Sequence, residues 1–122
     1  MLSTKENVAD KITTIHKLKD VVTHFSEELR LKAKAKEEVT VAGRLLEVKQ
    51  INEEYYAITL DDFIGETRVL LSNETYDHFQ SILHIGSFLS VQGFVNVVTR
   101  SIKGKIKKQY SVVGYNIHLL SI

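Results

Sequence analysis

The sequence predicts a mainly β fold, a closed barrel of five strands with one helix between the third and fourth strands and an amphipathic helix before the first. Three observations support this architecture. Apolar residues recur every three or four positions near the N-terminus, they alternate with polar residues in later segments, and glycines interrupt strands that must bend to close a barrel. The chain has 122 residues, 43% of them hydrophobic and 25% charged, which suits one globular core.

The first thirty residues contain the predicted amphipathic helix. Their apolar residues are spaced as on one helical face: Val8, Ile12, Ile15, Leu18, Val22, Phe25 and Leu29. Ser3 or Thr4 is the candidate N-cap, and the basic residues up to Lys36 suit the negative end of the helix dipole. We therefore expect a helix and basic linker at residues 1–36 and a β domain at residues 37–122. The apolar face can pack on that domain or pair with another chain, and the sequence leaves both open.

After Glu38 the sequence has the period of β-strands. The first strand is expected over residues 39–48, where the extra apolar residue Leu46 close to Gly43 indicates a bulge or a strong bend. The second strand is expected over residues 55–60. Its even-numbered residues form the apolar face, so its odd-numbered residues point outward.

A third strand is expected after the turn-forming residues 61–65. Its odd-numbered residues point inward. Arg68 and Leu70 therefore lie on the outer face together with Tyr55 and Thr59.

A helical period returns at residues 73–85, with Ser72 or Asn73 as the N-cap and Gly86 as the stop signal. Two further strands are expected at residues 88–98 and 110–120, each with an internal glycine that allows bending. The basic run RSIKGKIKK joins them as a flexible hairpin. Five strands with a helix after the third form the layout of an OB barrel.

The charged residues are distributed unevenly. All 15 acidic residues precede residue 79, whereas the five Lys and Arg residues after it lie between Arg100 and Lys108. A basic segment without acids favours a directed contact with a polyanion, although a solvated hairpin tip would carry the same charges. No stretch has the length and apolarity of a membrane span or a secretory signal, so we expect a cytoplasmic protein without a membrane partner.

The carboxylates and histidines of the sequence do not show the spacings that are typical of catalytic or metal-binding sites. The adjacent carboxylates at 61–62 and at 53–54 have no partner base nearby in sequence and suit turns. The five histidines lack the close spacings of a zinc site, and the chain has no cysteine. We therefore predict no catalytic residue, no metal site and no cofactor, and thus a protein that is not an enzyme.

The segments VTVAGRLLEV, ITLDD, TRVLL and ETYDHFQSILHIGSFLSVQGFV resemble the nucleic-acid-binding OB domain of bacterial DNA polymerase III alpha subunits. Similar OB modules are the anticodon-binding domains of class II aminoacyl-tRNA synthetases. The resemblance covers about residues 39–120. It implies that the ligand crosses the outer face of strands 2 and 3, flanked by the loops at residues 50–54 and 100–108.

Positions carried over from this family and residue types suited to single-stranded nucleic acid together define the candidate site. Its members are Arg44, Lys49, Tyr55, Thr59, Arg68, Arg100, Lys103, Lys105, Lys107, Lys108 and Tyr110. Ala57 is a departure, because relatives often have an aromatic ring for base stacking at that position. Tyr55 on the same face can supply the ring; without it a stacking contribution of about 1–3 kcal/mol per base is lost.

The sequence therefore predicts a non-catalytic module that binds single-stranded DNA with little sequence preference during DNA replication or repair. Binding of RNA or tRNA is the nearest variant. The alternative is a protein–protein interaction module, in which the barrel and the N-terminal helix bind a protein partner or a second copy of the chain.

Overall fold

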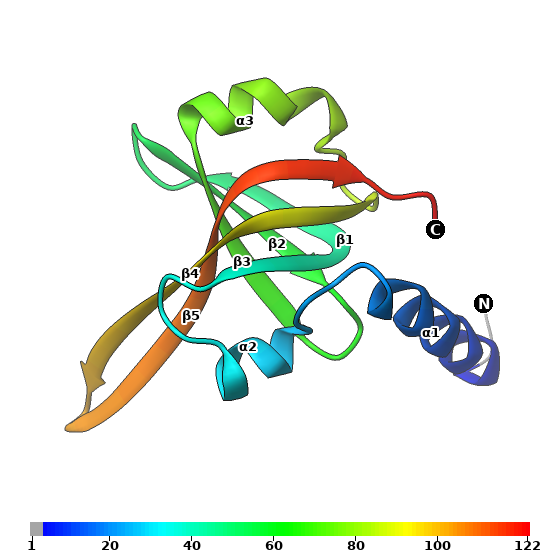
Figure 1. Cartoon of the computed structure of the whole chain (residues 1–122), viewed down its shortest axis with the longest axis horizontal. Helices are drawn as coiled ribbons and strands as arrows, with labels where there is room; N and C mark the ends of the chain where they lie inside the picture. The colour runs from blue at the N-terminus through cyan, green and yellow to red at the C-terminus, as the bar shows by residue number, and fades with distance from the viewer. Residues whose placement is uncertain (1–3) are drawn as a thin grey trace.

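The computed structural model describes residues 4–122, with side chains from Val8 onward, so the candidate N-caps Ser3 and Thr4 lie outside the described side chains. The elements in chain order are α1 (Thr4–Lys19), α2 (Ser26–Lys32), β1 (Glu38–Gln50), β2 (Tyr55–Asp61), β3 (Glu66–Ser72), α3 (Asn73–Phe79), a 3-10 turn (Gln80–Ile82), β4 (Phe88–Ile102) and β5 (Lys105–Leu119). Figure 1 shows the strands curving around one core.

The strands form a closed barrel in the order β1-β2-β3-β5-β4. Neighbouring strands are antiparallel except β3 and β5, which pair in parallel at Val69 and Val112 and close the barrel. The five-stranded, mainly β architecture with a helix between β3 and β4 confirms the predicted fold class.

Two irregularities bend the strands. The β1–β2 register shifts between Leu45 and Glu47, which confirms the bulge predicted at Leu46. The β4–β5 register shifts between Gln92 and Gly93. A side chain at position 93 would collide with the carbonyl oxygen of Val113, so glycine is required for this close approach of two strands.

Helices α2 and α3 cover opposite ends of the barrel, with α3 at the top and α2 at the bottom of Figure 1. Leu29 and Ala33 from the α2 segment belong to the same buried cluster as the inward side chains of all five strands. Tyr76 of α3 stacks on Tyr56 of β2 with ring centroids 3.6 Å apart. At the start of α3, the hydroxyl of Ser72 accepts a hydrogen bond from the Thr75 amide, so Ser72 is the N-cap, as expected.

The predicted N-terminal helix is present as α1, but its predicted continuation to Leu29 is wrong, because the chain leaves the helix after Lys19 and begins a second one at Ser26. Between them, the Thr23 amide donates to the Thr40 carbonyl and the Thr40 amide donates to the Thr23 hydroxyl, both at 2.9 Å. These bonds to β1 replace the bonds that a continuous helix would make. Val8 remains 49% exposed on α1, whereas Leu29 on α2 is 2% exposed.

The hairpin predicted around Gly104 is confirmed, but its strands are longer than predicted, because the β4–β5 ladder continues to the pair Ile102 and Lys105. Only Lys103 and Gly104 form the turn, with φ values of 52° and 77°, the positive values that a tight two-residue hairpin turn requires. The basic residues are therefore held on an ordered two-stranded ribbon. We call residues 96–111 the arm; its tip projects away from the barrel in Figure 1.

Candidate nucleic-acid interface

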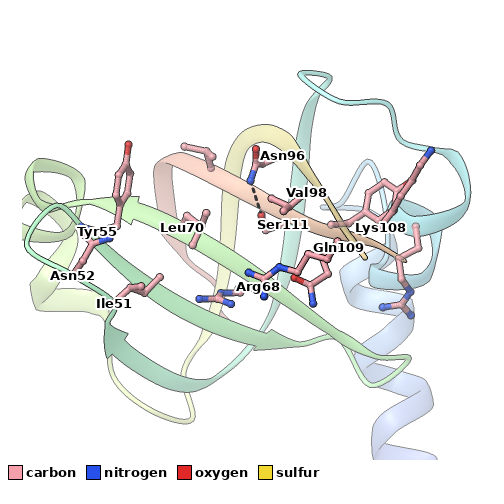
Figure 2. Close-up of a pocket in the computed structure, with 14 residues that line it drawn as sticks. Ile51, Asn52, Tyr55, Arg68, Leu70, Asn96, Val98, Lys108, Gln109 and Ser111 are labelled. Atoms are coloured by element: carbon pink, nitrogen blue, oxygen red, sulfur yellow. Dashed lines mark hydrogen bonds between the residues drawn. The ribbon is translucent and has the colours of Figure 1, made fainter. Parts of the chain in front are cut away.

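A groove of about 690 Å³ lies on the outer face of β2 and β3. It is bounded by the β1–β2 loop, by the base of the arm and by one residue of α2. Its lining residues are Arg30, Ile51, Asn52, Tyr55, Arg68, Leu70, Asn96, Val98, Arg100, Lys108, Gln109, Tyr110, Ser111 and Val113. Figure 2 shows Arg68 and Leu70 between Tyr55 on one side and Lys108 on the other.

The floor of the groove follows from the β2–β3 register. Thr59 lies opposite Arg68 and Ala57 lies opposite Leu70, so alternation places these side chains on the outer face, as predicted. Ala57 is nevertheless only 8% exposed, whereas Tyr55 is 39% exposed and lines the groove. The ring available on this face is thus that of Tyr55.

The β1–β2 loop is fixed by its own polar groups. The side-chain oxygen of Asn52 accepts hydrogen bonds from the amides of Glu54 and Tyr55, at 2.8 and 3.0 Å. The Asn73 amide donates to the Glu54 carbonyl, which ties the loop to the start of α3. Asn52 and Tyr55 are therefore presented to the groove by an ordered turn.

The base of the arm forms the opposite wall. Asn96 on β4 is paired with Ser111 on β5, and their side chains make a hydrogen bond of 3.4 Å. Val98 and Arg100 follow at alternate positions of β4, so they share the face of Asn96. Across the ladder, Lys107 lies opposite Arg100 and shares its face of the arm.

The groove is electropositive. Four cationic side chains line it, those of Arg30, Arg68, Arg100 and Lys108, and within the described part of the chain no carboxylate does. The ion pairs found among the described side chains lie elsewhere and join Arg44 to Asp61 and Lys32 to Glu28, and the His24 imidazole lies 3.5 Å from the Glu37 carboxylate. Like charges gathered without neutralising acids repel one another, and an anionic ligand would relieve that repulsion.

The structure brings five predicted site residues together in the groove: Tyr55, Arg68, Arg100, Lys108 and Tyr110. The other six do not line it. Arg44 is paired with Asp61 at 3.7 Å and lies over the ring of Phe63. Lys49 and Thr59 are on the outer surface of β1 and β2. Lys103 and Lys105 are farther out on the arm, and Lys107, although opposite Arg100, is not among the lining residues.

Sequence reasoning did not include the remaining lining residues in the site. Ile51 and Asn52 belong to the loop predicted to flank the ligand, and Leu70 had been placed on the correct face. Asn96, Val98, Gln109, Ser111 and Val113 were missed because nothing in their residue types distinguishes them from other residues of the strands on either side of the basic run. Arg30 is 38 residues from Arg68 in sequence and was assigned to the end of the N-terminal helix.

Asp62, one of the adjacent carboxylates, has a structural role. It is buried, and its Oδ1 accepts hydrogen bonds from the amides of Ile64 and Gly65 at 2.9 and 2.8 Å, which agrees with its assignment to a turn. Among residues with described side chains, no three His, Asp or Glu residues are grouped as a metal site would require. No helix in the described range is long and apolar enough to span a membrane.

No family model matches the chain, and no curated protein matches it in sequence. Among solved structures, the chain is similar to Rim1, a mitochondrial single-stranded DNA binding protein from S. cerevisiae, with a TM-score of 0.54 and 16% sequence identity. The similarity covers 70% of this chain and 94% of Rim1. At this identity the comparison shows a shared fold, and together with the strand order and inserted helix it establishes the OB fold of this chain.

Proposed function

We propose that this protein is a non-catalytic module that binds single-stranded nucleic acid, with DNA as the preferred ligand, in cytoplasmic DNA replication or repair. The observation that carries the proposal is the groove on β2 and β3, which combines four cations with an exposed Tyr55 ring. Cations contact the phosphates and a ring stacks on a base, and both contacts are indifferent to sequence. The described fold is also that of Rim1, whose ligand is single-stranded DNA.

The test is a titration of fluorescent oligo(dT) with the protein at several salt concentrations. If each of the four groove cations contacts one phosphate, log K falls against log[salt] with a slope of about −3, because each contact on a single strand contributes about −0.7. Oligo(U) in parallel measures the preference for DNA over RNA. Absence of binding to both at low salt would refute the proposal.

Two arginine variants locate the interface. Arg68→Gln removes a groove cation, whereas Arg44→Gln removes an equal charge from β1 at a position that is paired with Asp61 outside the groove. We expect Arg68→Gln to weaken binding about eightfold at 50 mM salt, the loss of one phosphate contact, and Arg44→Gln to have a smaller effect. Equal losses of affinity in the two variants would indicate that overall charge, and not a contact in the groove, determines binding.

A protein partner or self-association through α1 is a second candidate function. Val8 and Ile12 lie one helical turn apart on α1 and are 49% and 51% exposed. Light scattering after size-exclusion chromatography would compare the wild-type chain with a Val8→Glu/Ile12→Glu variant. A dimer that becomes a monomer in this variant would support self-association, and a wild-type monomer at all concentrations would count against it.

A further inference from the structure

We propose that the N-terminal segment completes the nucleic-acid groove and that Arg30 of α2 binds a backbone phosphate of the single strand. This inference rests on the proposed function. Arg30 is the one groove-lining residue within the described part of the chain that lies outside the β2–β3 face, the β1–β2 loop and the β4–β5 strands. It therefore adds a binding contact from a segment outside the barrel strands.

The helix that carries Arg30 is held against the barrel by apolar packing. Leu29, the residue before Arg30, is 2% exposed, and Ala33 one turn later is 8% exposed. Both are part of the barrel core. Because Leu29 points into that core, its neighbours on the helix point along or away from the barrel surface, and Arg30 reaches the groove.

A buried carboxylate fixes the start of the same helix. Asp62 accepts hydrogen bonds from the Ser26 amide at 2.6 Å and from the Ser26 hydroxyl at 3.0 Å, while it also accepts from two amides of its own turn. An acceptor at this position satisfies a free amide of the first helical turn and complements the positive end of the helix dipole. The two hydrogen bonds between Ser26 and Asp62 thus hold the start of α2 at the β2–β3 turn.

The β2–β3 turn lies against the Ser26 hydroxyl and close to the Arg30 guanidinium. A Cβ atom at Gly65 would lie 2.8 Å from the Ser26 hydroxyl and 3.7 Å from Nη2 of Arg30. Arg30 is therefore next to the turn that ends β2, whereas Tyr55 begins β2 at the other end. The groove thus has a ring at one end and a cation at the other, with Arg68 on the floor between them.

The local charges leave Arg30 available for an anion. The neighbouring Lys32 is paired with Glu28 at 3.6 Å on the same helix, and Arg30 has no ion pair among the described side chains. The other charged side chains that line the groove are also cations. A phosphate positioned there would interact with Arg30 through charge-assisted hydrogen bonds, for which the guanidinium geometry is well suited.

The test compares Arg30→Gln with Lys32→Gln. Both variants remove one positive charge from an exposed position of α2, but only residue 30 lines the groove. Binding of fluorescent oligo(dT) is measured from 50 to 300 mM salt, with Arg68→Gln as a third variant. Urea unfolding of each variant verifies that the fold is intact.

We expect Arg30→Gln to weaken binding about eightfold at 50 mM salt and to make the salt slope shallower by about 0.7, the values for one phosphate contact. Lys32→Gln should retain the wild-type slope. If Arg30→Gln and Lys32→Gln behave alike while Arg68→Gln weakens binding, the inference about Arg30 is wrong and the proposed function stands. If the wild-type chain does not bind at 50 mM salt, the proposed function and this inference both fail.

Discussion

The packing of α2 on the barrel can be tested with two leucines of one helix. Leu29 is 2% exposed within the barrel core, and Leu31, two residues later on the same helix, is 72% exposed. We expect Leu29→Ala to lower the free energy of unfolding by about 3 kcal/mol, because truncating a buried leucine loses its transfer free energy and leaves a cavity. Leu31→Ala should change it by less than about 0.5 kcal/mol.

The assay is urea unfolding followed by circular dichroism. With a denaturant slope of about 1–3 kcal/mol per molar urea, the loss of about 3 kcal/mol lowers the midpoint by about 1–3 M. Helix propensity and the leucine-to-alanine change are common to both variants, so the difference between them measures the packing of residue 29. Equal midpoints for the two variants would show that α2 is not packed on the barrel, and would remove the support for Arg30 at the groove.

Three further predictions concern single contacts. Gly93→Ala should destabilise the protein by about 1–3 kcal/mol in thermal unfolding, because the methyl group meets the Val113 backbone; an unchanged stability would show that the strands can separate there. Asp62→Asn should cost about 1–3 kcal/mol, more than Asp61→Asn, because Asp62 is 2% exposed and two segments depend on its oxygens; the same unfolding assay decides the order. The hydrogen bond from Tyr115 to Glu38 raises the pKa of Tyr115 above 10.0, so Glu38→Gln should lower that pKa in an absorbance titration referenced to Tyr115→Phe, and an unchanged value would contradict the contact.

The barrel could be predicted from sequence because its strands have a strong period. Inward residues recur at every second position of β2 and β3, and the turn residues between these strands mark where β2 ends. The helix expected over residues 73–85 is shorter, because α3 ends at Phe79 and a 3-10 turn follows over Gln80–Ile82. The bulge at Leu46 was also readable, since an extra apolar residue breaks the alternation. Strand alternation, turn residues and the bulge are all set by residues close together in sequence, which is why the strand order of the barrel could be predicted.

The break in the N-terminal helix, the length of the arm and the position of Arg30 were not predicted, and they share a physical cause. The break after Lys19 depends on hydrogen bonds between Thr23 and Thr40, which are 17 residues apart, while the periodicity of the apolar residues continues through the break. The outer part of the arm carries exposed lysines, a residue type depleted in strands, so intrinsic strand propensity does not predict the cross-strand pairing seen there. Arg30 reaches the groove through the contact of Ser26 with Asp62, 36 positions later.

The regular ladder of the arm also makes its reach adjustable. Because successive side chains of a strand point to opposite faces, removing two residues from each strand of the arm shortens it and leaves the remaining side chains on their present faces. Removing one from each strand near the base would turn every side chain beyond the cut to the other face. An OB barrel with such an arm can thus vary the reach of its basic hairpin in discrete steps, while the groove and the barrel core stay unchanged.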